Sequence, residues 1–127
     1  NNGSVSASSS YSGGIAARTT KNIINCVNNG NVTGQYYLGG IAGSLQNSNA
    51  IVKNSINNGV ISTTINSGTV NLGCIVGYNK GKVVDNENNG NYLLPENNSC
   101  FSYGYIIGYD TVGETGVYNN INNYGIE

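Results

Sequence analysis

A short phrase built on Gly-x-Ile recurs four times along this chain, once in roughly every thirty residues. In each copy, two small or aliphatic residues follow the isoleucine; the copies span Gly13–Ala17, Gly39–Gly43, Gly73–Gly77 and Gly104–Gly108. A repeat of about 20 to 50 residues is typical of proteins in which each unit stacks on the next one. The repeat therefore constrains the fold before any single residue is considered.

A second phrase, Asn-Asn-Gly, alternates with the first. It begins at residues 1, 28, 57 and 88, and a final copy, at 122, has tyrosine in place of glycine. The successive spacings are 27, 29, 31 and 34 residues. Positions around the phrase keep their character. A β-branched residue stands seven places before the glycine (Ile23, Val52, Val83, Val117), and Asn or Asp stands five places before it (Asn25, Asn54, Asp85, Asn119).

Each unit contains three short apolar segments bounded by Gly, Asn or Ser, which is the pattern of strands and turns. No segment of ten or more residues has a helical period. We therefore predict an all-β chain, a parallel β-solenoid (β-helix) of about four coils with three short strands per coil. Residues 1–127 form a single repeat domain, with units of approximately 1–27, 28–56, 57–87 and 88–121 and a partial unit at 122–127.

Equivalent residues of successive coils should stack on one another. We therefore predict a buried core column in register, made of Ile15, Ile41, Ile75 and Ile106. Flanking glycines are expected to let the walls of a narrow core approach closely. The chain has 25 asparagines. Asparagine tolerates left-handed turns, and stacked asparagines can form amide ladders, so we interpret this composition as structural.

The segments Asn25–Val32 and Leu38–Gly43 resemble the GLUG-motif repeat of large secreted and surface-anchored microbial proteins. The resemblance covers essentially the whole chain and is best in the second and third units. The fourth unit departs from the pattern, with Tyr92 and Tyr105 where small or aliphatic residues are usual. The resemblance implies an extracellular, cell-surface location and a structural or adhesive role, and it supplies no catalytic residues.

The sequence carries no catalytic signal, and we expect no enzymatic activity, no metal and no cofactor. The chain has no histidine, and Asp85 and Glu87 are interpreted as a solvated surface rather than a catalytic pair. Asp110 and Glu114 are a weak calcium candidate. The three cysteines (Cys26, Cys74, Cys100) fit neither a disulfide framework nor a metal site, and Cys26 and Cys74 are expected to lie too far apart to bridge.

Charge is segregated along the chain. All five cations precede residue 83 and all six anions follow it, although the net charge is only −1. Five dispersed cations do not favour nucleic acid or a membrane surface, and no segment is apolar enough for membrane insertion. The chain also begins without methionine, so we expect a processed product or a piece of something longer.

The first and last residues fall at the same phase of the repeat and neither end resembles a polar cap, which solenoids need to stay monomeric. We therefore expect the chain to associate with itself, head to tail, into a filament. The residues expected to take part are Asn2, Gly3, Val5, Ile15, Ile106, Ile121, Tyr124 and Ile126. Two alternatives stay open. One is a module that binds surface glycans through Tyr36, Tyr37, Tyr78 and Tyr109, of which Tyr78 and Tyr109 share one phase of the repeat and should stack. The other is a passive spacer in a larger adhesin.

Overall fold

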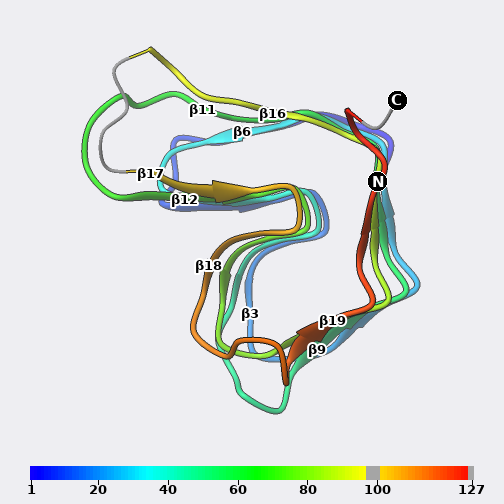
Figure 1. Cartoon of the computed structure of the whole chain (residues 1–127). Helices are drawn as coiled ribbons and strands as arrows, with labels where there is room; N and C mark the ends of the chain where they lie inside the picture. The colour runs from blue at the N-terminus through cyan, green and yellow to red at the C-terminus, as the bar shows by residue number, and fades with distance from the viewer. Residues whose placement is uncertain (97–100, 126–127) are drawn as a thin grey trace.

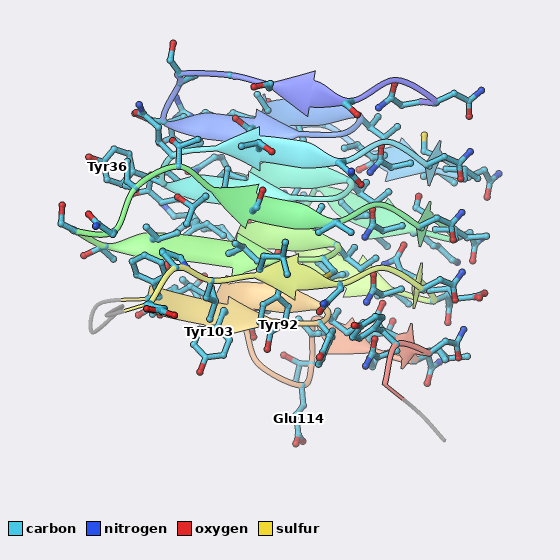
Figure 2. All side chains as sticks on the ribbon, turned by 90° about the horizontal axis from the view of Figure 1, so that it is seen from above. Tyr36, Tyr92, Tyr103 and Glu114 are labelled. Atoms are coloured by element: carbon cyan, nitrogen blue, oxygen red, sulfur yellow. The ribbon has the colours of Figure 1, made fainter. Side chains whose placement is uncertain are left out.

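The computed structural model describes residues 1–96 and 101–125, and all the regular structure in these residues is β-strand. Twenty short strands form five parallel sheets of four strands each. Figure 1 looks along the stack, so the coils lie almost on top of one another, and Figure 2 shows the same coils as layers from the side. The predicted fold class, a parallel β-solenoid of about four coils, is confirmed.

Each sheet takes one strand from every coil. The first sheet contains β1 (Val5–Ser6), β6 (Val32–Gly34), β11 (Ile61–Thr63) and β16 (Tyr92–Leu93). The second contains β2 (Tyr11–Gly13), β7 (Tyr37–Gly39), β12 (Val70–Gly73) and β17 (Phe101–Gly104). The third contains β3 (Ala16–Thr19), β8 (Ala42–Leu45), β13 (Val76–Asn79) and β18 (Ile107–Asp110).

The last two sheets complete the coil. The fourth contains β4 (Ile23–Ile24), β9 (Ile51–Lys53), β14 (Lys82–Val84) and β19 (Val117–Tyr118). The fifth contains β5 (Val27–Asn28), β10 (Ile56–Asn57), β15 (Glu87–Asn88) and β20 (Ile121–Asn122). The expectation of three strands per coil was therefore wrong, because two of the three predicted segments bend and each contributes two strands.

The first bend lies inside the Gly-x-Ile phrase. Strand β7 ends at Gly39 and β8 begins at Ala42, so the phrase is a corner between the second and third sheets. A Cβ atom added to Gly39 would lie 1.9 Å from the carbonyl oxygen of Ala42, and one added to Gly43 would lie 2.7 Å from that of Tyr37. Only glycine lets the two arms of the corner approach this closely. The glycines thus shape a bend, rather than lining one straight strand as expected.

The second bend lies between the fourth and fifth sheets. Here Asn25, Asn54, Asp85 and Asn119 adopt left-handed backbone conformations, with φ between 51° and 58°. A short polar side chain can adopt this conformation because it hydrogen-bonds locally. The Asn or Asp that recurs five places before the last residue of each Asn-Asn-Gly phrase therefore marks this corner in the sequence.

The interior is divided into two apolar clusters. The larger contains Ile23, Ile41, Ala42, Leu45, Ala50, Val52, Ile75, Val76 and Val83. The smaller, between the first and second sheets, contains Val32, Leu38, Ile61, Val70, Leu72 and Cys74.

The predicted isoleucine column is in register. Backbone hydrogen bonds of 3.1, 3.0 and 3.0 Å join Ile15 to Ile41, Ile41 to Ile75 and Ile75 to Ile106. Ile41 and Ile75 are completely buried, Ile106 is half-buried, and Ile15 is 38% exposed. Burial of all four was therefore wrong for the end coils, because those coils have a neighbour on one side only.

Replacing Ile41 with Ala should lower the free energy of unfolding by about 2–5 kcal/mol, the usual cost of a cavity in a packed core. Ile15→Ala removes the same atoms from the same column at an exposed site, so its cost should be clearly smaller. Urea unfolding followed by circular dichroism measures both. Equal losses in the two variants would contradict the assignment of the core.

Candidate functional site

The first asparagine of each Asn-Asn phrase points inward and forms a ladder through the whole stack. The Nδ2 group of each donates to Oδ1 of the next coil, at 3.0, 2.9, 3.0 and 2.9 Å. This inner ladder contains Asn1, Asn28, Asn57, Asn88 and Asn122. Its three middle members are completely buried.

Each inner amide also closes a turn within its own coil. Asn57 shows the arrangement: its Nδ2 donates to the Gly59 carbonyl at 3.0 Å, and its Oδ1 accepts from the Gly59 N–H at 3.2 Å. Both amide hydrogens and the oxygen of a middle amide therefore have partners. Complete satisfaction is what allows a polar group to remain buried at little cost.

The inner ladder packs against the glycine corner in the middle of the coil, between the two apolar clusters. We call this contact between the ladder and the corner the waist. A Cβ atom added to Gly40 would lie 2.3 Å from Cγ of Asn57, and one added to Gly14 would lie 2.4 Å from Cγ of Asn28. In the third coil Cys74 stands at the position that Gly14 and Gly40 occupy in the first two coils. Burial raises the pKa of its thiol to about 12, partly opposed by a hydrogen bond with Asn88.

The second asparagine of each phrase forms an outer, exposed ladder that runs in the opposite direction. Here Nδ2 of each later coil donates back to Oδ1 of the earlier one, at 2.7, 2.7, 2.8 and 2.7 Å. This outer ladder contains Asn2, Asn29, Asn58, Asn89 and Asn123. Two adjacent rows of amides thus have opposite donor directions.

At the two ends of the stack, these ladders leave different atoms open. Among the described residues, Oδ1 of Asn1 accepts only from its own turn and Nδ2 of Asn2 has no acceptor. At the other end, and again within residues 1–96 and 101–125, Nδ2 of Asn122 donates only to its own turn and Oδ1 of Asn123 has no donor. The first end therefore presents an acceptor on the inner row and a donor on the outer row. The last end presents a donor on the inner row and an acceptor on the outer row.

The residues predicted to take part in self-association divide between the two ends. Asn2, Gly3, Val5 and Ile15 belong to the first coil, and Ile106, Ile121 and Tyr124 belong to the last. Ile121 differs from the others, because it belongs to an outward-facing column with Val27, Ile56 and Glu87 and is exposed along its side of the stack. Ile126 lies outside the described residues.

The last coil ends in a cluster of four tyrosines that was not predicted from the sequence. The ring centroid of Tyr92 lies 5.4 Å from that of Tyr103 and 4.8 Å from that of Tyr105. The centroids of Tyr105 and Tyr124 lie 5.7 Å apart. Figure 2 shows Tyr92 and Tyr103 at this end of the stack. The signal was present in the sequence, because Tyr92 and Tyr105 are the departures from the repeat pattern.

Three of the four tyrosines named as candidate glycan contacts come together. Tyr78 and Tyr109 stack with 5.6 Å between centroids and 7° between planes, which confirms the predicted pairing. Tyr37 meets Tyr78 edge to face at 5.8 Å. Tyr36 instead packs against the smaller apolar cluster. Tyr11, which had not been predicted, extends the row by stacking on Tyr37 at 4.6 Å.

Three acidic side chains, those of Asp85, Glu87 and Asp110, contact neighbours within the stack. Asp85 lies 4.0 Å from Lys53 Nζ, and Glu87 Oε1 accepts from Asn123 at 2.8 Å. Asp110 accepts from Asn79 at 2.9 Å and from the N–H groups of its own turn. In residues 1–96 and 101–125 no group of three His, Cys, Asp or Glu side chains is placed to hold a metal ion.

Cys26 and Cys74 are both free thiols, as expected from their separation. Cys26 is half-buried and its backbone N–H donates to Ser55, which begins a further polar column. In that column Asn86 donates to Oδ1 of Asn120 at 3.0 Å and to the Val52 carbonyl at 2.9 Å. Cys100 lies outside the described residues.

Comparison with known proteins adds no functional assignment. No model of a known family matches the chain, and searches of curated proteins and of solved structures found no significant match. The resemblance to the GLUG-motif repeat therefore stays a prediction. Within the described part of the chain, no helix is long and apolar enough to cross a bilayer.

Replacing Asn57 with Ala should lower the free energy of unfolding by more than about 3 kcal/mol. Its neighbours Asn28 and Asn88 and the Gly59 backbone would lose buried partners, and each such loss costs about 1–3 kcal/mol. Asn58→Ala removes the exposed ladder member beside it and should cost under about 1 kcal/mol. Similar values for the two variants in urea unfolding would contradict the role of the inner ladder.

The raised pKa of Cys74 predicts a loss of stability at alkaline pH. The folded state keeps the thiol proton, whereas an unfolded thiol releases it near pH 9.0. This contribution should be complete below about pH 9 and should disappear as the pH rises towards about 12. Cys74→Ala, which lacks the thiol, is the reference: its unfolding free energy should fall less steeply. Equal slopes for both proteins would refute the assignment.

Proposed function

We propose that this chain is a structural module that stacks head to tail with further copies of itself, giving a filament with its strands across the axis. The observation that carries the proposal is the opposite direction of the two asparagine ladders. An end that presents an acceptor on the inner row and a donor on the outer row is complementary to the other end of the same molecule. Two like ends placed inner row against inner row are not complementary.

The atoms match in one orientation. With the last coil of one copy against the first coil of the next, Asn122 Nδ2 faces Asn1 Oδ1 of the next copy. The next copy's Asn2 Nδ2 then faces Asn123 Oδ1. A contact between two like ends that keeps inner row against inner row would instead place acceptor against acceptor at the first ends, or donor against donor at the last ends. A heterologous contact that does not close into a ring extends as an open filament.

Size and charge favour the same orientation. Tyr92, Tyr103 and Tyr105 occupy the phases that Val5, Ser12 and Gly14 occupy in the first coil, so large side chains would meet small ones. The first coil also carries Arg18 and Lys21, whereas the last carries Asp110 and Glu114. Glu114 projects beyond the last coil (Figure 2). Opposite charges on the two ends favour head-to-tail contact over either symmetric one.

An extracellular, adhesive setting is part of the proposal and is supported by the GLUG-like phrases alone. The competing function is that of a passive spacer, in which the same two surfaces meet further coils of a longer polypeptide. The two differ in one property of the 127-residue chain. A self-assembling module adds copies as the concentration rises, whereas the coils of a spacer are held together by the chain itself and need no such affinity for free copies.

Sedimentation velocity and electron microscopy of the purified chain test the proposal. We expect filaments whose length increases with concentration and decreases with salt, because salt screens the end charges. Tyr103→Lys should abolish them, since this end tyrosine, 50% exposed, lies in the contact. Tyr118→Lys is the matched control: Tyr118 is 47% exposed in the same coil but belongs to an outward column with Lys53 and Val84. A folded monomer at high concentration and low salt, or equal behaviour of the two variants, would overturn the proposal.

A further inference from the structure

A groove runs along the outside of the stack, on the side where the second and third sheets turn back on each other. In Figure 1 this is the inward turn of the ribbon between β17 and β18. The groove has a volume of about 360 Å³ and is lined by Tyr37, Thr69, Asn71, Tyr78, Ser102 and Tyr109. None of these residues belongs to the asparagine ladders or to the end tyrosines.

Two outward-facing columns form its walls. On the second sheet, register places Tyr11, Tyr37, Asn71 and Ser102 in line. On the third sheet, it places Arg18, Ser44, Tyr78 and Tyr109 in line. The floor is nearly bare backbone, because a Cβ atom at Gly77 would lie 2.5 Å from the Leu38 carbonyl oxygen. The glycine corner therefore creates a concave face that a regular solenoid wall lacks.

Tyrosine rings follow the groove through all four coils. Tyr11 stacks on Tyr37, Tyr37 meets Tyr78 edge to face, and Tyr78 stacks on Tyr109. The lining residues are uncharged. Arg18 and Lys80 lie over the rings of Tyr11 and Tyr78, at 5.5 and 5.8 Å from their centroids, so both cations are already engaged with aromatic faces.

Asn71 differs from the other polar residues of this wall because its side-chain oxygen is buried without a hydrogen-bond donor in the described part of the chain. It is only 4% exposed, yet its Oδ1 atom accepts no hydrogen bond from the described residues. A buried oxygen without a donor is costly and calls for an explanation. The terminal amide torsion is broad, so a small rotation would turn the amide towards the groove. A ligand that donates a hydroxyl there would remove the cost.

We propose that this groove binds a neutral oligosaccharide, with sugar rings lying on the tyrosine faces and a sugar hydroxyl donating to Asn71. Tyrosine suits this task because it combines a flat apolar face with a polar tip. An added peptide strand is disfavoured, because β7 and β12 are paired on both sides and have no open edge. A polyproline segment is disfavoured as well, since proline has no N–H to give to Asn71.

This inference does not depend on the proposed filament, because the whole groove lies within one copy. A chain kept monomeric by Tyr103→Lys should bind the sugar as well as the unaltered protein does. Failure to assemble and failure to bind are therefore separate results.

The test is a binding screen of the full chain on an array of neutral and charged glycans, followed by calorimetric titration of the strongest neutral hexasaccharide. The chain has no tryptophan, so quenching of tyrosine fluorescence gives an independent signal. Tyr78→Ala and Asn71→Leu should each weaken binding about tenfold or more, the effect expected for loss of one aromatic or hydrogen-bonded contact. Tyr78→Phe keeps the ring and should bind more tightly than Tyr78→Ala.

Tyr118→Ala is the control, because Tyr118 is an exposed tyrosine outside the groove lining. Circular dichroism establishes that each variant is folded before its affinity is compared. Three results would overturn the proposal: no binding to any neutral glycan, binding to charged glycans or peptides only, or affinity lost equally in Tyr118→Ala and Tyr78→Ala.

Discussion

Coils that stack in parallel must be held at one register, and in this chain the buried asparagine amide supplies the strictest requirement. Asn28, Asn57 and Asn88 are completely buried, and each uses both its donors and its acceptor in the ladder and in its own turn. A shift of one residue between two coils would leave several of these groups unpaired inside the protein. Apolar contacts alone tolerate such shifts far better, because the hydrophobic effect has no direction.

The ladder also explains the shape of the coil. Its amides occupy the waist and lie close to the chain opposite them, where glycine stands in the first two coils, at Gly14 and Gly40, and Cys74 stands in the third. The corner that results divides the interior into two apolar clusters and makes the outer face concave. The tyrosine groove is therefore a consequence of how the waist is packed. The asparagine phrase and the Gly-x-Ile phrase are the two sides of one contact.

The parts of this structure that depend on phase were predictable from sequence. Register, the isoleucine column, amide stacking and the Tyr78–Tyr109 pair all follow from equal position in successive repeats. The number of strands per coil was not predictable in this way. It depends on contacts such as that of Gly39 with the Ala42 carbonyl, which join residues within one coil and leave no periodic signal. The exposure of Ile15 shows a related limit, because a repeat pattern describes the middle of a stack better than its ends.

The unpaired oxygen of Asn71 was also beyond sequence reasoning. The residue stands in register with Tyr37 and Ser102 and lies outside the Asn-Asn phrases, so its sequence separates it from the ladder members. The sequence does not show that its oxygen is buried without a donor among the described residues, because that depends on the position of the side chain against the groove.

Hydrogen exchange of side-chain amides, followed by ¹⁵N NMR with assignment of each asparagine, tests the central claim most directly. The inner-ladder Nδ2 groups of Asn28, Asn57 and Asn88 should exchange as slowly as the backbone amides of the neighbouring strands. Those of Asn29, Asn58 and Asn89, which form the exposed outer ladder, should exchange much faster. Fast exchange at the three inner amides, with the strands themselves protected, would contradict the account.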